Sequence, residues 1–236
     1  MDCRECINTN CFINGYCLPN WIGYIQYNKT IKSLAANRSI FSRGDLVEGI
    51  YVMCSGKAKI VMRTYNERQK EKEQIIRVAG NGQIMGHRGL SEEMIYPISA
   101  ETIAESEIAY ISNTDFIKLI NSNKDFAYHL MMFFADELLR SEQIQRAFDI
   151  YSINQKVSFA LLSIASSFGY KNDTKGELDL CMNLKDLANF ASVSMQSLNK
   201  VFDRLTDKNI LEVVDEKVFL FNESGLLDYA RFNYTG

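Results

Sequence analysis

The chain has 236 residues, of which 47% are apolar and 23% charged, and its formal net charge is −3. This composition is typical of globular domains and excludes a disordered chain, and the length suffices for one large domain or two small ones. The polar opening lacks the features of a signal peptide, and no stretch approaches the ~20 consecutive apolar residues of a membrane helix. We therefore expect a cytoplasmic protein with no membrane partner.

The N-terminal segment, residues 1–20, contains four of the six cysteines of the chain: Cys3, Cys6, Cys11 and Cys17. In a reducing compartment, clustered cysteines are more often metal ligands or redox thiols than disulfides. Four thiolates this close in sequence suit an all-cysteine zinc site or an iron–sulfur cluster, and spacing alone does not separate the two. A thiol–disulfide switch and purely structural cysteines are the alternatives.

Residues 38–112 alternate apolar and polar side chains in short runs, as strands do. Turn signals containing glycine interrupt the runs at residues 44–45 and 55–56, and the charged run 66–74 is expected to form a solvated hairpin loop. Short, evenly spaced strands broken by glycine favour a barrel or jelly roll.

From Thr114, an expected N-cap, the period changes to that of a helix that continues to residue 148. Positions on one face of this helix recur every three or four residues. They are Leu130, Phe134, Leu138, Ser141, Ile144 and Phe148. This face fits either the barrel of its own chain or the parallel helix of a second copy. We expect the second arrangement, a homodimer with a dimerisation helix over residues 123–150.

The C-terminal part, residues 151–236, begins with an amphipathic helix that ends at Gly169. Two short helices follow, with expected N-caps at Asn183 and Ser194 and the turn SVS between them. Such a pair is the helix-turn-helix unit, and the hairpin sequence ILEVVDEKVFLFN adds the wing of a winged helix.

The second of these helices carries a polar stripe that has no role in a core. In a helix-turn-helix, the N-terminal residues of the second helix contact base edges in the major groove. The candidate DNA-binding residues are Ser194, Met195, Gln196, Asn199 and Lys200. Gln and Asn pair bidentately with adenine, and Lys donates to guanine or phosphate. An ordinary helical hairpin is the alternative, and nine Lys/Arg against eleven Asp/Glu over residues 150–236 argue mildly against DNA binding.

From about residue 35 the chain resembles the CRP/FNR family of bacterial transcription regulators. The stretches IFSRGDLVEGIYVMCSGKAKI, GQIMGHRGL and ISAETIAESEIAYIS resemble its cyclic-nucleotide-binding-type β-roll, and NLKDLANFASVSMQSLNKVFDRLTDKNIL resembles its winged helix. The order of the elements is also that of the family. The resemblance implies an α+β fold with an N-terminal double-stranded β-helix (a cNMP-binding-like jelly roll), a long dimerisation helix and a C-terminal winged helix-turn-helix.

The resemblance implies a homodimer that binds a pseudo-palindromic operator in double-stranded DNA and contacts RNA polymerase. We expect a sensor β-roll over residues 21–122 ahead of the dimerisation helix and the DNA-binding domain. Met195 stands where the family usually has Arg or Val, so this side chain cannot hydrogen-bond a base. We expect no enzyme, since a cupin-type metal site needs two or three histidines on neighbouring strands, and of the two histidines here, His87 and His129, the second lies in the long helix. The alternative is a ligand- or redox-sensing β-roll protein that does not act through specific DNA binding.

Family members that bind cyclic AMP carry a Glu after the cassette glycine and an Arg-Ser pair at the start of the next strand. Here Gly86 is followed by His87 and Arg88, and Ile98 and Ser99 occupy the Arg-Ser position. Cyclic AMP in its usual pose is therefore not expected, because burying a phosphate without a charge partner is costly. The candidate effector pocket consists of Gly86, His87, Arg88 and Ser99. It holds a different anion or is a surface turn that needs no ligand.

The oxygen-sensing members of the family hold a [4Fe–4S] cluster on three N-terminal cysteines, CxxC-x5-C, and a fourth in the β-roll. Here the second spacing is x4 and about Ala109 stands at the β-roll position, so the fourth ligand would be Cys17 or Cys54. Cys54 and Cys181 lie among apolar neighbours and are expected to be buried core thiols. The expected metal ligands, for iron–sulfur ahead of zinc, are Cys3, Cys6, Cys11 and Cys17.

Overall fold

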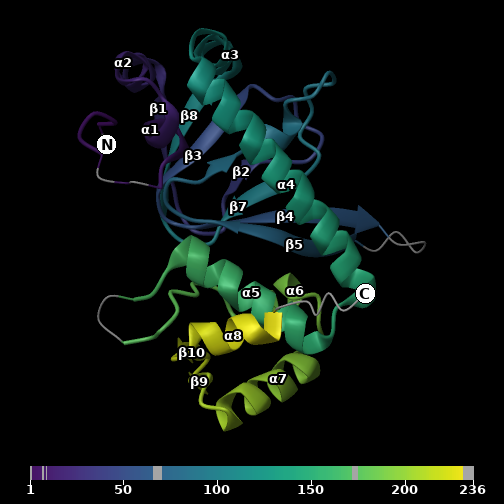
Figure 1. The fold of residues 1–236 in the computed structure, drawn as a ribbon. Coiled ribbons are helices and arrows are strands. Elements are labelled where there is room, and N and C mark those ends of the chain that lie inside the picture. The colour runs from purple at the N-terminus through teal and green to yellow at the C-terminus, as the bar shows by residue number, and fades with distance from the viewer. Residues whose placement is uncertain (1, 7, 9, 66–70, 172–174, 231–236) are drawn as a thin grey trace. The chain divides into compact units, whose positions relative to one another are not determined.

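The computed structural model describes residues 2–6, 8, 10–65, 71–171 and 175–230, with the backbone alone described for residues 65, 71 and 143–150. The chain forms two compact units, Met1–Ser141 and Glu142–Gly236 (Figure 1). The boundary between them falls within helix α4 (Lys124–Ile150), near the end of the expected dimerisation helix.

The first unit contains a β-roll of two four-stranded sheets, which confirms the expected jelly roll. The strand orders are β1-β8-β3-β6 and β2-β7-β4-β5, and every pair is antiparallel. The strands are β1 (Thr30–Leu34), β2 (Ser39–Phe41), β3 (Gly49–Ser55), β4 (Ala58–Tyr65), β5 (Glu71–Ala79), β6 (Ile84–Met85), β7 (Ser99–Thr102) and β8 (Ser106–Ser112).

Strand β5 begins earlier than the charge pattern indicated. The expected loop spans residues 66–74, yet residues 71–74 pair with β4, and residues 66–70 lie outside the described residues. On the outer face, the Glu73 carboxylate accepts hydrogen bonds from Lys59 Nζ at 3.0 Å and from Arg63 Nη2 at 2.8 Å. The charges that suggested a loop therefore form cross-strand pairs on a solvated sheet face.

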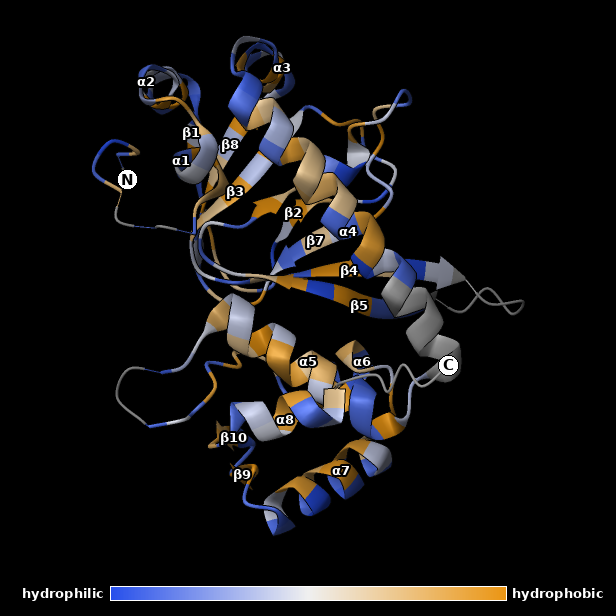
Figure 2. Cartoon of the chain, in the orientation of Figure 1, coloured by the Kyte–Doolittle hydropathy of each residue, from blue (hydrophilic) through white to orange (hydrophobic). Residues whose placement is uncertain are grey.

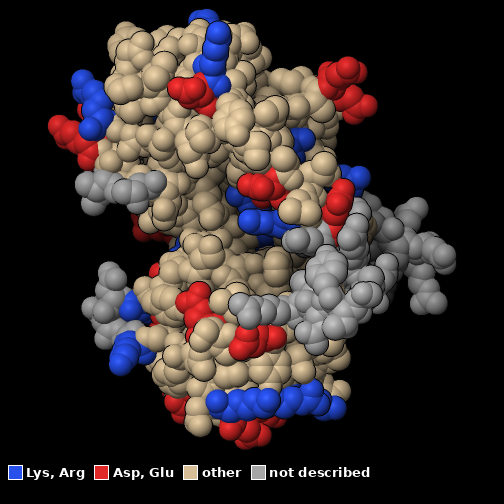
Figure 3. Space-filling model, viewed as in Figure 1, with Lys and Arg blue, Asp and Glu red and all other residues tan. Residues whose placement is uncertain are grey.

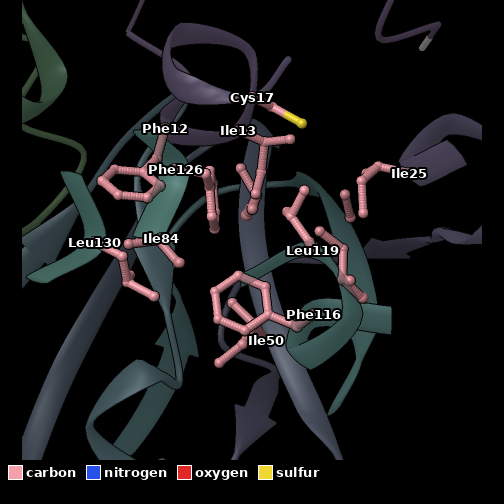
Figure 4. Close-up of a cluster of buried hydrophobic side chains, with 13 residues drawn as sticks. Phe12, Ile13, Cys17, Ile25, Ile50, Ile84, Phe116, Leu119, Phe126 and Leu130 are labelled. Atoms are coloured by element: carbon pink, nitrogen blue, oxygen red, sulfur yellow. The ribbon is translucent and has the colours of Figure 1, made fainter. Parts of the chain in front are cut away.

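Strand β3 is buried on both faces, which explains its nearly continuous apolar sequence. Tyr51 and Met53 point into the roll, where they pack with the apolar side chains of the second sheet. Ile50 and Val52 point the other way, into a second apolar cluster that the helices of this unit cover. Figure 4 shows this second cluster, to which the N-terminal residues Phe12, Ile13 and Cys17 contribute.

Two helices that the sequence reasoning missed precede the roll: α1 (Phe12–Tyr16) and α2 (Pro19–Asn28). Pro19 stands at the first position of α2, where its fixed φ suits a helix and its missing N–H loses no hydrogen bond. The boundary expected between residues 20 and 21 therefore falls inside α2.

The single helix expected from Thr114 to residue 148 is two helices, α3 (Asn113–Ser122) and α4. Ser112, and not Thr114, caps α3: its Oγ accepts from the backbone N–H of Asp115 at 3.2 Å. Asn123 separates the helices because its side-chain oxygen accepts from the N–H of Phe126 at 3.0 Å.

The face predicted along α4 has two environments. Leu130 is buried and Phe134 half-buried against the β-roll of the same chain, whereas Leu138 is 63% exposed. Ser141 is half-buried, and the side chains of Ile144 and Phe148 lie outside the described residues. The first half of the face therefore packs within the chain.

The second unit is a winged helix. Its elements are α5 (Ile153–Phe168), α6 (Leu184–Phe190), α7 (Met195–Asp207), β9 (Leu211–Val214), β10 (Lys217–Leu220) and α8 (Glu223–Ala230). As expected, α5 ends at Gly169, whose φ of +74° suits a residue without a side chain. A capping box starts α5: Ser152 Oγ accepts from the N–H of Gln155, whose side chain accepts from the N–H of Ser152. No helix in the described part of the chain is long and apolar enough to cross a bilayer.

Candidate functional site

The helix-turn-helix begins its two helices at the expected caps. Asn183 Oδ1 accepts from the N–H of Asp186 at 2.8 Å, and Ser194 Oγ accepts from the N–H of Ser197 at 3.1 Å. Between the helices, Ser192 takes a φ of +55°, which lets the chain turn within three residues. The backbone N–H of Val193 donates to Ala188 O at 2.9 Å and closes the turn.

Helix α7 has one apolar and one polar face (Figure 2). The buried residues are Leu198, Val201, Phe202 and Leu205. All five candidate DNA-binding residues are exposed: Ser194, Met195, Gln196, Asn199 and Lys200. Among the described residues, the side chains of Gln196, Asn199 and Lys200 have no hydrogen-bond or ion-pair partner, so their polar groups face solvent. This arrangement leaves the start of α7 available to an external ligand.

The wing is a tight hairpin with an acidic tip. Strands β9 and β10 are joined by Asp215 and Glu216, with φ values of +50° and +62°. Two consecutive positive φ values are typical of a type I′ turn, in which Asn-Gly is preferred. On the face shown in Figure 3, basic atoms run along α7 with acidic atoms beside them. The basic groups of this unit therefore form a run that lies next to acidic groups on this face.

Three of the four N-terminal cysteines line one cavity. Cys3, Cys6 and Cys11 lie there with Cys54 of β3 and with Lys29, which follows α2. The cavity measures about 430 Å³ out to its open mouth. Lys29 Nζ donates to Cys3 Sγ at 2.9 Å, and the N–H of Cys3 donates to Gln26 Oε1 at 2.8 Å.

Cys54 lies two residues beyond Val52 on β3, so it points to the same side of the strand, and both side chains line this cavity. The pairing of β3 with β8 shifts register between Met53 and Ser55, which leaves Cys54 as the extra residue. Cys54 is half-buried and lines the cavity, so the expectation of a buried core thiol was wrong. The same expectation was wrong for Cys181, which is exposed in the loop before α6.

The cysteine segment is held against the roll at Gly82. The N–H of Phe12 donates to Gly82 O at 3.2 Å. A Cβ on Gly82 would lie 2.6 Å from the carbonyl of Asn10 and 2.7 Å from the nitrogen of Cys11, and the φ of Gly82 is +84°. Only glycine permits this approach of two backbones.

Cys17 lies apart from that cavity. It is buried in the apolar cluster beside Ile13 (Figure 4), and burial raises the pKa of its thiol to about 11. Burial also raises the pKa of Cys11 and of Cys54. A buried thiolate therefore needs a positive partner, which Lys29 or a bound metal supplies.

The chemistry of the cavity fits a thiolate-bound cluster. The thiols of four cysteines and the ammonium group of Lys29 face a common space. The remaining residues that line this space are mostly apolar. As the side chains stand, no three His, Cys, Asp or Glu residues in the described part of the chain are gathered at metal-binding distance. The donor set thus suits iron–sulfur or zinc, provided that the segment carrying Cys3 and Cys6 closes around the metal.

The candidate effector pocket is a small cavity of about 290 Å³ out to its mouth. Gly86, His87 and Arg88 line it, together with Arg77 of β5. Ser99 does not line it, because its Oγ is buried and accepts from the N–H of Arg43 at 2.9 Å. Among the apolar side chains that fill the roll, the rings of Phe41 and Tyr96 stack with centroids 4.3 Å apart, and both line the cavity.

Comparisons with known proteins agree with this geometry. Residues 31–123 match the family model of the cyclic nucleotide-binding domain. The transcriptional activator protein FnrA of Stutzerimonas stutzeri is 19% identical over 233 residues, which cover 96% of this chain and 93% of the relative. The cyclic AMP receptor protein of Thermus thermophilus is 23% identical over 195 residues, which cover 83% of this chain and 85% of that protein.

Among solved structures, FixK2 from Bradyrhizobium japonicum superimposes with a TM-score of 0.72 at 16% identity, covering 86% of this chain and 98% of that one. This likeness shows the shared fold. These findings show that residues 31–123 form a cyclic nucleotide-binding domain and that the chain is similar over most of its length to a bacterial transcriptional activator and to a cyclic AMP receptor protein.

Proposed function

We propose that this protein is a sequence-specific transcription regulator that binds double-stranded DNA through α7. The observation that supports this proposal is the stripe of exposed polar side chains at the start of α7, the capped second helix of the helix-turn-helix. This stripe consists of Gln196, Asn199 and Lys200, which have no partner among the described residues. The similarity to a protein named as a transcriptional activator, over 96% of this chain, supports the same class for this chain. Direct contact of these side chains with base edges supplies the specificity.

In vitro selection from random DNA duplexes tests this function. A regulator enriches a pseudo-palindromic sequence, and Gln196→Ala or Lys200→Ala then weakens binding by ~1–3 kcal/mol for each lost contact, roughly 5- to 150-fold. Thr206→Ala is the matched control, since Thr206 is exposed at the far end of the same helix. A β-roll sensor that does not act on DNA would enrich no sequence, and this outcome would refute the proposal.

The protein acts as a homodimer through α4. Exposed apolar side chains lie along the side of this helix that the β-roll leaves uncovered, among them Met131, Leu138 and Leu139. Burying such residues against a second copy removes apolar surface from water and stabilises the pair. Light scattering should give the mass of two chains, and Leu138→Glu should give one. The matched control is Tyr27→Glu, which changes an apolar residue that is 89% exposed on α2.

The signal acts at the cysteine cavity. We assign the ligands of a [4Fe–4S] cluster to Cys3, Cys6, Cys11 and Cys54, since these four line one cavity and Cys17 does not. The cluster, when bound, supplies a group that oxygen and oxidants destroy. Zinc is the less favoured occupant and would make the segment a structural clasp.

The chain's own residues carry the signal onward to α4. Cys11 is the residue immediately before α1, and Phe12 follows it. The Phe12 ring contacts the rings of Phe126 and Phe133, both on α4, with centroids 5.5 and 5.3 Å apart. Release of Cys11 therefore changes the packing of Phe12 on α4 and shifts the dimer between two states of different DNA affinity.

Protein purified without oxygen tests this assignment. The protein should contain about four iron atoms and about four acid-labile sulfide ions per chain, and it should have a brown absorption that air bleaches. Cys54→Ser should lose the iron, whereas Cys17→Ser and the exposed control Cys181→Ser should keep it. Loss of iron in Cys17→Ser with retention in Cys54→Ser would overturn the choice of Cys54, and stoichiometric zinc would overturn the oxygen sensor.

A further inference from the structure

Helix α2 holds the cysteine segment through two residues at its C-terminal end. Gln26 Oε1 accepts from the backbone N–H of Cys3 at 2.8 Å, and Lys29 Nζ donates to Cys3 Sγ at 2.9 Å. Gln26 and Lys29 are three positions apart, so their side chains leave the same side of the helix end. The ammonium group of Lys29 is thus directed at the sulfur of a candidate cluster ligand.

Two elements of regular structure fix the backbone of Lys29. Its N–H donates to Ile25 O at 2.8 Å and ends α2, and β1 begins at the next residue, Thr30. The Lys29 side chain is half-buried and lines the cysteine cavity. A positive charge at the C-terminal end of a helix is also favoured by the helix dipole. The ammonium group therefore has a defined place at the cavity.

The charge of Lys29 also acts on the cysteine that β3 contributes. Burial raises the pKa of the Cys54 thiol, and the positive charge of Lys29 partly offsets this effect. Among the described residues that line the cavity, Lys29 is the one with a basic side chain, and most of the others are apolar. Apolar surroundings screen a charge less than water does, so an ammonium group acts more strongly here than at the surface.

We propose that Lys29 raises the reduction potential of the cluster site and so sets the oxidant level at which the cluster is lost. This inference rests on the proposed function, which assigns a [4Fe–4S] cluster to the cysteines of this cavity. A cluster bound by four thiolates has net negative charge, and its net charge and the hydrogen bonds to its sulfurs tune its potential. A fixed positive charge stabilises the reduced state, which carries one more electron, more than the oxidised state.

Lys29 acts on the site through its charge and undergoes no reaction itself. One electron passes between the cluster and an external oxidant or reductant, and Lys29 keeps its proton in both states. Because the ammonium group favours the state with the extra electron, oxidation by molecular oxygen becomes less favourable. Lys29 is therefore a positioning residue that raises the amount of oxygen needed to switch the protein.

Three variants of Lys29, purified without oxygen, separate the charge from the hydrogen bond. Lys29→Met removes both, Lys29→Gln keeps an N–H donor without the charge, and Lys29→Arg keeps both. The potential is measured by titration with dithionite while the visible absorption is recorded. Lys29→Met should lower the equilibrium constant for reduction by roughly 10-fold or more, which for one electron is a potential more negative by about 59 mV. Air should also bleach Lys29→Met faster than the unmodified chain.

The matched control is Lys32→Met. Lys32 is an exposed residue of β1 whose ammonium group lies over the Tyr110 ring, 4.6 Å from the ring centroid, and it does not line the cavity. This variant removes the same charge and should keep the potential of the unmodified chain. Lys29→Arg should keep that potential as well, and Lys29→Gln should shift it in the direction of Lys29→Met.

Equal potentials in Lys29→Met and the unmodified chain, or equal shifts in Lys29→Met and Lys32→Met, would overturn the role of Lys29. An unshifted potential in Lys29→Gln would assign the effect to the hydrogen bond and overturn the role of the charge. Iron content guards against a folding failure: loss of iron in Lys29→Met with retention in Lys29→Arg supports the charge, and loss in both overturns it. An unmodified chain without iron would refute the proposed cluster and this role with it, whereas a failed DNA selection would refute the regulator and leave these potentials unaffected.

Discussion

Gly82 and Gly44 form a matched pair that tests how the cysteine segment is held. Their φ values, +84° and +90°, impose similar strain on an added side chain, about 1 kcal/mol. A Cβ on Gly44 meets nothing within 4 Å, whereas one on Gly82 meets the backbone of Asn10 and Cys11 at 2.6–2.7 Å. Backbone cannot rotate away as a side chain does, so Gly82→Ala adds about 1–3 kcal/mol of overpacking. We expect Gly82→Ala to lower the free energy of unfolding by about 2–4 kcal/mol and Gly44→Ala by about 1 kcal/mol.

Urea unfolding followed by the fluorescence of Trp21 measures both variants. Trp21 is the single tryptophan of the chain and lies on α2, so its signal reports the N-terminal unit. Protein purified without oxygen should also lose iron in Gly82→Ala and keep it in Gly44→Ala, because Cys11 moves with the displaced segment. Equal stabilities and equal iron contents would refute the reasoning that the close approach at Gly82 positions the cysteines.

Three further predictions concern single elements. Ser194→Ala should cost about 1 kcal/mol in thermal unfolding of the winged-helix unit by removing the cap of α7, and Ser194→Gly only a few tenths. The double variant Asp215→Asn, Glu216→Gly should raise the melting temperature of that unit, since Asn and Gly suit a type I′ turn. The same variant should bind DNA more tightly, because it removes two negative charges from the wing, and weaker binding would contradict this expectation. The Glu137 carboxylate, whose pKa the surrounding imidazole and guanidinium groups lower on folding, stabilises the N-terminal unit above the ordinary carboxyl pKa and loses this contribution as the pH falls through the lowered pKa; Glu137→Gln should flatten the acid limb of Trp21-monitored stability, and an unchanged limb would show that other groups dominate.

The elements that depend on local chemistry were predictable. The caps at Asn183 and Ser194 and the end of α5 at Gly169 follow from one residue type at one position, and the structure confirms them. The alternating strands of the roll likewise depend on a period of two. By contrast, Thr114 and Ser112 are both plausible caps from sequence, and the structure decides for Ser112, whose Oγ accepts from the N–H of Asp115.

The parts of the site that were missed depend on contacts distant in sequence. The alternation along β3 places Cys54 on the same side as Val52, but only the fold brings Cys3, Cys6 and Cys11 to that side of the strand. Glu137 is one of several acidic residues on α4, and only the fold brings it to Arg88, 49 positions away. Gly82 precedes a strand like many other glycines, and its role appears only when Cys11 lies against it.

Both candidate sensor sites contact the same turns of α4. Phe12, next to Cys11, packs on Phe133 with ring centroids 5.3 Å apart, and His87 packs on the same ring at 4.9 Å. Glu137 lies four residues beyond Phe133, on the same face of the helix, and binds Arg88. The N-terminal segment and the turn that carries His87 and Arg88 therefore contact adjacent positions of one helix. A structural change at either position therefore reaches α4 through the same aromatic ring, that of Phe133.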